Sequence, residues 1–298
     1  GYELEITATP VLTRDFRWNT TLTWSKNDNK ILSLAEGADE NQVISTVGTA
    51  SIIGRVGGTT GDLWGYKLVR DPEGNVVIGD NGLPEQADEI EYVGTAYADW
   101  KAGWYNEFSY KGFKLGILLD GQVGGTIYSM SFHKMMEQGK LTQSLNGRLP
   151  GTEYYMDASD PRIAAAGYTP QSGMYMIAPG VVRNDDGTFS PNTKVVTIES
   201  FYKEYYRRAN VETNSFDASF LKIREIRLEY ELPKKVLEKS PFSKASIAVY
   251  GRNLWCFTDY PLFDPESVAL DGSSMVSGIE TGSLPTTRTF GFNLNLTF

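Results

Sequence analysis

The chain of 298 residues has a single cysteine, Cys256, and a single histidine, His133. One cysteine cannot form an internal disulfide, and the two residues together cannot supply a structural zinc site. No stretch approaches the roughly 20 consecutive apolar residues that a membrane-spanning helix requires. The sequence therefore excludes a disulfide-stapled scaffold, a zinc-stabilised fold and a helical membrane protein.

Positive charge is also scarce. Lys and Arg total 28 against 37 Asp and Glu, which gives a formal net charge of −9. Because recognition of nucleic acid requires a clustered basic surface, we expect no nucleic-acid partner. Acidic residues gather between Asn29 and Gly103, but the spacing of a calcium-binding loop is missing. We therefore expect no metal site and no cofactor.

What the sequence has in abundance is glycine, with 30 residues, and tyrosine, with 17, as is typical of many strands joined by turns. In residues 2–9, Tyr2, Leu4 and Ile6 alternate with polar side chains, which is the period of a β-strand. Six further segments alternate in the same way. The predicted strands cover residues 2–9, 16–25, 104–111, 113–124, 216–232, 245–257 and 287–298. The fold class is therefore all-β, with about seven long antiparallel strands.

The connections between these strands alternate between short and long. Residues 29–103 and 125–215 lack sustained alternation and are rich in turn residues, so we interpret both as long loops, with one helix near Phe132–Lys140. His133 is expected on the surface of that helix. Short turns at one end and long loops at the other are typical of outer-membrane barrels. We therefore expect a segment of a large transmembrane β-barrel with long extracellular loops.

In a barrel, one face of each strand meets lipid and the other meets water. On the second strand, the apolar set Phe16, Trp18, Leu22 and Trp24 is predicted to face lipid. The last strand alternates without a fault and stops on an aromatic residue, like the terminal strand that directs assembly of outer-membrane proteins. Its apolar positions, the predicted assembly signal, are Phe290, Phe292, Leu294, Leu296 and Phe298.

Several sequence blocks occur in an order that carries a family resemblance. They are residues 1–5 with 16–18, 63–67, 108–115, 124–129, 218–225, 230–233, 251–255, 264–266 and 285–291. Together they cover nearly the whole chain. In this order they resemble the C-terminal part of SusC/RagA-type TonB-dependent transporters of the Bacteroidetes outer membrane.

The resemblance implies a 22-stranded barrel with a plug domain inside, opened by the TonB complex and capped by a SusD-like surface lipoprotein. It implies import of a nutrient, glycan or peptide, by a multi-pass protein of the bacterial outer membrane, without catalytic residues. Residues 1–298 would be one C-terminal portion of that barrel, lacking the plug and the N-terminal strands. We therefore expect the N-terminal barrel-and-plug portion to be bound as a non-covalent partner.

The alternation changes register within the strand 216–232. Apolar residues occupy odd positions at Leu221 and Ile223 but even positions from Ile226 onward. A one-residue slip would turn every later side chain to the wrong face, and a β-bulge is the usual device that prevents this. We predict a bulge near Arg224 and Glu225, with Lys222, Arg224 and Glu225 in a polar network facing the lumen. The alternative is a wall of solvated charges.

Aromatic residues in the loops are candidate ligand contacts, because their faces stack on sugar rings or peptide side chains. The selected residues are Trp64, Tyr66, Trp100, Tyr175 and Tyr205. The alternative is that the long loops pack on their own aromatic residues.

Two other functions remain open from the sequence. One is a secreted or surface β-rich carbohydrate-binding module, which would need no detergent. The other is a glycoside hydrolase that uses Asp264 and Glu266 as its carboxylate pair.

Overall fold

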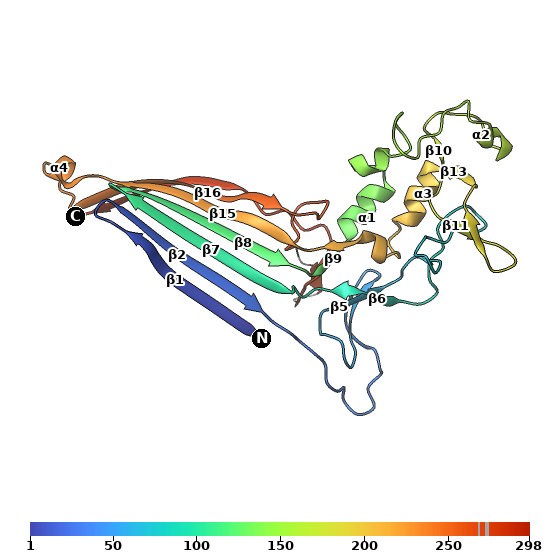
Figure 1. Cartoon of the computed structure of the whole chain (residues 1–298), viewed down its shortest axis with the longest axis horizontal. Helices are drawn as coiled ribbons and strands as arrows, with labels where there is room; N and C mark the ends of the chain where they lie inside the picture. Colours follow the sequence, from blue (N-terminus) through green and yellow to red (C-terminus); the bar gives the residue numbers. More distant parts are fainter. Residues whose placement is uncertain (268, 272–273) are drawn as a thin grey trace.

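The computed structural model describes residues 1–267, 269–271 and 274–298. Its main feature is a seven-stranded antiparallel sheet in which each strand pairs with the next long strand along the chain (Figure 1). The order is β1 (Tyr2–Leu12), β2 (Phe16–Lys26), β7 (Trp100–Tyr110), β8 (Phe113–Val123), β15 (Phe220–Glu231), β16 (Lys244–Phe257) and β20 (Thr289–Thr297). All seven predicted long strands are thus confirmed.

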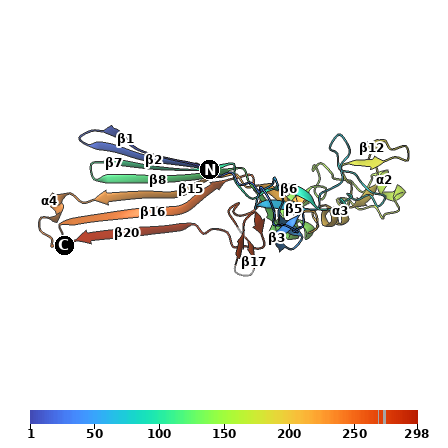
Figure 2. The same cartoon turned by 90° about the horizontal axis from the view of Figure 1, so that it is seen from below.

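The two ends of the sheet differ as expected. Short connections and the helix α4 (Lys234–Leu237) lie at one end, and all the long loops lie at the other (Figure 2). The hairpin between β7 and β8 turns on Lys111 and Gly112, whose φ angles of 45° and 89° are both left-handed. Two left-handed residues form the tight turn whose twist matches an antiparallel hairpin, and glycine adopts it at least cost.

One face of the sheet is apolar from the first strand to the last. Residues paired across strands share a face, so the register assigns every side chain. The apolar face carries Leu4 and Ile6 of β1, Leu22 and Trp24 of β2, Trp104 and Phe108 of β7, Leu115 and Ile117 of β8, Ile226 and Leu228 of β15, Ile247 and Val249 of β16, and Phe292 and Leu294 of β20. Many of these are exposed, Phe292 by 77% and Val249 by 55%. The predicted set Phe16, Trp18, Leu22 and Trp24 lies on this face.

Polar groups on the apolar face are paired with tryptophan. The indole Nε1 of Trp18 donates to the side-chain oxygen of Asn106 at 3.0 Å, and that of Trp104 donates to the hydroxyl of Thr20 at 2.9 Å. Each bond satisfies two groups that would be costly to leave unpaired away from water. The two polar residues are therefore compatible with an apolar surrounding.

The predicted bulge in β15 is confirmed. The pairing of β15 with both β8 and β16 shifts between Ile223 and Glu225. Relative to β8, Arg224 is the extra residue, whereas β16 has two residues at this point, Asn253 and Leu254. Of these two, Asn253 adopts a left-handed φ of 51°. Because of this shift, Ile223 and Ile226 lie on the same apolar face although their numbers differ in parity.

The long loops contain more regular structure than expected. Residues 29–103 were predicted to be loop, and this prediction is wrong because they contain a four-stranded sheet. Its strands are only four to six residues long, and neighbouring side chains such as Ile52 and Ile53 are both buried, so the sequence shows no alternation there. Its strands are β3 (Gln42–Val47), β4 (Ala50–Gly54), β5 (Asp62–Gly65) and β6 (Glu91–Thr95). The predicted strand 216–232 also divides, since β14 (Ser215–Asp217) lies in a separate sheet. There it pairs with β9 (Thr126–Ser129), which pairs on its other side with β19 (Ile279–Glu280).

The second long loop holds most of the helices. They are α1 (Met130–Glu137), η1 (Thr142–Leu145), α2 (Pro161–Ala165), α3 (Ile198–Tyr205) and η2 (Glu212–Asn214), with short strand pairs β10 (Tyr175–Ile177) with β13 (Val195–Thr197), and β11 (Val181–Arg183) with β12 (Phe189–Pro191). The third loop holds the pair β17 (Ala269–Asp271) and β18 (Ser274–Val276). The predicted helix near Phe132–Lys140 corresponds to α1. Within the described residues, no helix combines the length and the apolar character needed to span a bilayer.

Helices α1 and α3 share a hydrophobic core, in which Phe132 and Met136 of α1 pack with Phe201 and Tyr202 of α3. His133 belongs to this interior, with 1% exposure, so its predicted surface position is wrong. Its Nδ1 lies 2.6 Å from the carbonyl oxygen of Tyr206, and burial lowers the pKa of its imidazole. The loops therefore fold into a packed body of their own.

Candidate functional site

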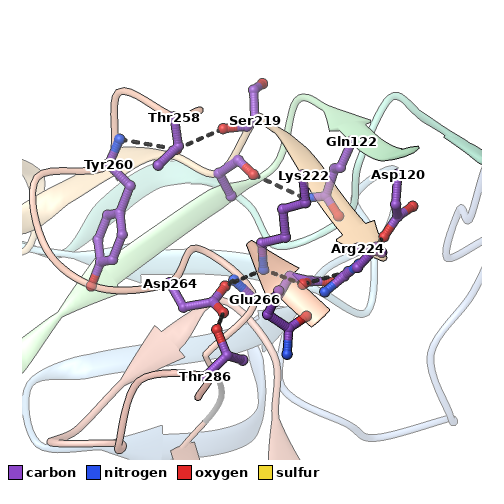
Figure 3. Close-up of polar contacts among 12 residues, drawn as sticks. Asp120, Gln122, Ser219, Lys222, Arg224, Thr258, Tyr260, Asp264, Glu266 and Thr286 are labelled. Carbon is purple, nitrogen blue, oxygen red and sulfur yellow. Dashed lines mark hydrogen bonds and ion pairs between the residues drawn. The ribbon is translucent and has the colours of Figure 1, made fainter. Parts of the chain in front are cut away.

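A network of charged side chains lies where the third long loop meets the polar face of the large sheet. Lys222 and Arg224 project from β15, and the segment 258–267, which follows β16, folds back over them (Figure 3). We call Lys222, Arg224, Asp120, Asp264 and Glu266 the charged network. It connects three parts of the chain that are far apart in sequence.

The inner half of the charged network is buried. Lys222 Nζ lies 2.6 Å from Asp264 Oδ1, and the two side chains are 4% and 3% exposed. Asp264 also accepts hydrogen bonds from the Thr286 hydroxyl, at 2.6 Å, and from the Glu266 amide, at 2.9 Å. Burial by itself raises the pKa of Asp264, but the bonds from Lys222 and Thr286 outweigh it and the pKa is lowered. The carboxylate is therefore held in its charged form.

The outer half of the charged network is more open to solvent. Arg224 donates through Nε and Nη2 to Asp120 Oδ2, at 2.7 and 2.5 Å, and through Nη2 to both oxygens of Glu266. Lys222 also donates to Glu266, which joins the two halves. The side chains of Asp120 and Glu266 are 33% and 37% exposed. An aqueous solution can thus screen the outer ion pairs but not the inner one.

Further contacts fix the start of the segment against β15. The Thr258 hydroxyl donates to the carbonyl of Ser219 at 2.8 Å and accepts from the Tyr260 amide at 3.1 Å. The ring of Phe220 lies 4.7 Å from Lys222 Nζ, a distance suited to a cation–π contact. The segment 258–267 therefore begins and ends on defined partners.

The sequence prediction of this region is confirmed in part. Lys222 and Arg224 do lie in a polar network beside the bulge, but Glu225 pairs separately with Arg252, at 2.6 Å. Asp120 was not foreseen as a partner, because its distance of 104 positions from Arg224 leaves no local signal. Asp264 and Glu266 were foreseen only as a possible carboxylate pair. Both are engaged in ion pairs, which gives no support to a hydrolase.

The five aromatic residues selected as ligand contacts lie in different places. Tyr175 is 7% exposed and stacks on Tyr168, with its hydroxyl donating to the carbonyl of Thr169. Trp100 begins β7 and pairs with Val123 on the apolar face of the sheet. Neither position opens onto a described cavity of the loop body.

Trp64 and Tyr66 lie at the end of the four-stranded sheet. Trp64 packs edge-on against Tyr92, and its Nε1 is buried without a hydrogen-bond partner among the described residues. The carbonyl of Tyr66 accepts from the amide of Val211 at 3.0 Å. Tyr66 thus helps to join the first loop to the second, whereas Trp64 packs within the four-stranded sheet.

Tyr205 lies in the wall of a groove in the loop body. It lines a groove of about 460 Å³ together with Tyr154, Tyr206 and Pro179. The remaining lining residues are Thr142, Gln143, Leu145, Asn146, Thr152, Phe201 and Tyr202, so the groove lacks charged side chains. Its aromatic walls and amide groups suit a neutral ligand.

Two of the three comparisons with known proteins found matches. No family model matches the chain. Over alignments that cover all of this chain, it is 26% identical to TonB-dependent receptor P3 and 24% identical to TonB-dependent receptor P26, both from Formosa agariphila. The alignments include 28% and 29% of those receptors, so the chain spans about three-tenths of their length.

Solved structures give the same result for the fold. The chain superimposes on the RagAB peptide importer in the closed-closed state with a TM-score of 0.62 and 15% identity, over 99% of this chain and 29% of the matched chain. The RagAB peptide transporter matches with a TM-score of 0.59, also at 15% identity and over the same shares of the two chains. The fold is therefore that of the C-terminal part of an outer-membrane transporter barrel.

The homologues of this chain are TonB-dependent receptors, and its structural neighbours are of the SusC/RagA type. The resemblance inferred from the sequence is confirmed. These relatives are receptors and transporters rather than enzymes.

Proposed function

We propose that this chain forms part of the wall and the extracellular loops of a TonB-dependent importer in the bacterial outer membrane. The continuous apolar face of the sheet carries the proposal. A solvated binding module would expose this face to water, including Phe290, Phe292 and Leu294. Lipid covers such a face without cost, while the opposite polar face lines water. The chain then crosses the membrane seven times.

The two edges of the sheet support the proposal that further strands pair with it. In the described part of the chain, β1 pairs with β2 alone and β20 pairs with β16 alone. Each unpaired backbone group in lipid costs several kcal/mol, so both edges require a partner strand. We propose that an N-terminal barrel-and-plug portion supplies these strands and couples the barrel to the TonB complex. Phe290, Phe292, Leu294, Leu296 and Phe298, on and just after β20, then act as the assembly signal.

The packed body formed by the long loops supports the proposal of a partner on the extracellular side. Its helices α1 and α3 share a hydrophobic core, and the body lies beyond the end of the sheet (Figure 1). We propose that a SusD-like lipoprotein rests on this body and helps to capture a nutrient, either glycan or peptide. Among the five predicted contact residues, Tyr205 has the position best suited to touch cargo, because it lines the neutral groove.

Uptake by cells tests the proposal. Cells with and without the gene are given fluorescent oligosaccharides and oligopeptides, and the outer-membrane fraction is probed for the chain. We expect the chain in that fraction, gene-dependent uptake of one cargo class, and loss of uptake when a protonophore removes the energy that TonB uses. Recovery of the chain from the culture medium as a detergent-free monomer would contradict the proposal.

A further inference from the structure

The charged network joins a loop to the barrel wall from the inside. Lys222 lies on the polar face of β15, because its neighbours Leu221 and Ile223 both lie on the apolar face. The segment 258–267 leaves the end of β16 and reaches over β15 to bring Asp264 and Glu266 onto this face. The segment therefore lies on the side of the sheet that lines the lumen.

We propose that Lys222 and Arg224 are positioning residues that hold the segment 258–267 inward, so that it narrows the extracellular mouth of the lumen. This inference rests on the proposed function, because the polar face is a lumen only in a closed barrel. Neither residue needs to contact cargo. They act through Asp264 and Glu266, which carry the segment.

The two halves of the charged network have different strengths. Lys222 and Asp264 are both almost fully buried, and removing one partner of a buried pair leaves an uncompensated charge. Arg224 and Glu266 are partly exposed, so water and salt weaken their attraction. Lys222 is thus the principal anchor, and Arg224 is a second contact that can be exchanged without releasing the segment.

Arg224 lies at the bulge of β15. As the extra residue of β15, Arg224 has no direct partner in the ladder, and its side chain reaches both Asp120 on β8 and Glu266 on the segment. Continuing the alternation from Lys222 and Ile223 puts Arg224 on the polar face, and the shift that follows keeps Glu225 on that face as well. Arg224 therefore places its guanidinium between the wall and the loop, and Ile226 returns to the apolar face.

Access to the narrowed mouth of the lumen can be measured at a recess on the polar face of the sheet. A recess of about 480 Å³ lies on the polar face, lined by Glu3, Thr23, Lys101 and Asp120 among others. Asp120 belongs both to this recess and to the charged network. A cysteine at Thr23 therefore reports on access to the lumen beside the segment.

The test uses the full-length transporter in cells, with Cys256→Ser as the background and Thr23→Cys as the reporter. The outer-membrane fraction of the same cells is checked first, so that failure of the proposed function is recognised separately. Labelling is then compared between a small impermeant thiol reagent and a bulky maleimide polymer. We expect Lys222→Met to speed the bulky reagent by about tenfold while the small reagent is unchanged, since the anchor is lost.

Hydrogen exchange of the purified transporter gives a second readout. The Glu266 amide donates to Asp264, so it reports directly on the anchored state. We expect this amide to exchange at least about tenfold faster in Lys222→Met, and Lys222→Arg to restore both the exchange rate and the labelling ratio. Arg252→Gln, which breaks the exposed pair with Glu225 on the same face, is the matched control and is expected to change neither.

Two results would overturn the inference. An unchanged Glu266 amide in Lys222→Met would mean that Lys222 does not anchor the segment. A faster amide with an unchanged labelling ratio would mean that the contact is structural and does not narrow the mouth.

Discussion

Lys222 Nζ and Asp264 Oδ1 lie 2.6 Å apart, although 42 positions separate the two residues in the sequence. The pKa of Asp264 is lowered because bonds from Lys222 and Thr286 outweigh the effect of burial. A carboxyl group with a lowered folded-state pKa contributes stability above its unfolded pKa, near 3.9, and loses it as the pH falls through the lower folded value. The contact is therefore expected to persist at neutral and mildly acidic pH.

The direction in which stability changes with pH can be measured with Asp264→Asn, which keeps the shape of the side chain but does not titrate. The difference in melting temperature between the wild type and this variant is expected to be constant from pH 7 to about pH 5 and to shrink below about pH 4. A difference that grows as the pH falls would contradict the assignment.

The turn between β7 and β8 depends on Gly112. With φ at 89°, an added Cβ would be strained and would lie 3.0 Å from the carbonyl oxygen of Glu231. We expect Gly112→Ala to destabilise the barrel by about 1–2 kcal/mol in urea unfolding from lipid vesicles. Lys111→Gly is the control, and it is expected to be neutral or stabilising because Lys111 also has a left-handed φ. Equal losses from both variants would argue against this account of the turn.

Leu22 lies in the middle of β2 on the apolar face. Leu22→Arg is expected to cost about 2–4 kcal/mol of stability in lipid, because a charge near the bilayer midplane loses its hydration. Thr21→Arg places the same charge one residue away on the polar face, where water is present, and is expected to cost little. If both substitutions had the same small effect in lipid vesicles, the membrane assignment of this face would fail.

Deleting Arg224 removes the extra residue of β15. The shortened strand alternates regularly from Leu221 onward, so Leu228 stays toward lipid, Glu229 stays toward the lumen, and the variant is expected to assemble. Deleting Ile226 instead keeps the bulge but turns Leu228 toward the lumen and Glu229 toward lipid, which is expected to prevent assembly. Arg224→Ala keeps the length of the strand and is expected to assemble. Heat-dependent migration on a gel distinguishes folded from unfolded barrels, and an assembled Ile226 deletion variant would refute this account of the register.

The large sheet could be predicted because its information is local. The alternation in β1, the flip of parity between Ile223 and Ile226 and the glycine of the β7–β8 turn are each visible within a few residues. Lipid on one side and water on the other impose a strict period of two, which a sequence displays directly. The resemblance to a transporter family then favoured an outer-membrane barrel as the interpretation of this sheet.

The loops and the network depend on contacts between distant parts of the chain. Ile52 and Ile53 are both buried, so β4 shows no alternation and was taken as loop. The burial of His133 depends on α3 and the carbonyl of Tyr206, 73 positions away. The pairing of Lys222 with Asp264 is set in the same way by the fold of the third loop, and charge alone did not reveal it.

The central claim, that one face of the sheet meets lipid and the other meets water, is tested most directly by spin labels. Leu228 and Glu229 are adjacent on β15 and point to opposite faces. Each is replaced by a labelled cysteine in the full-length transporter, with Cys256→Ser, in lipid vesicles. The account predicts that oxygen from the bilayer relaxes the label at position 228, whereas a water-soluble nickel complex relaxes the label at position 229. Equal access of the nickel complex to both labels would contradict it.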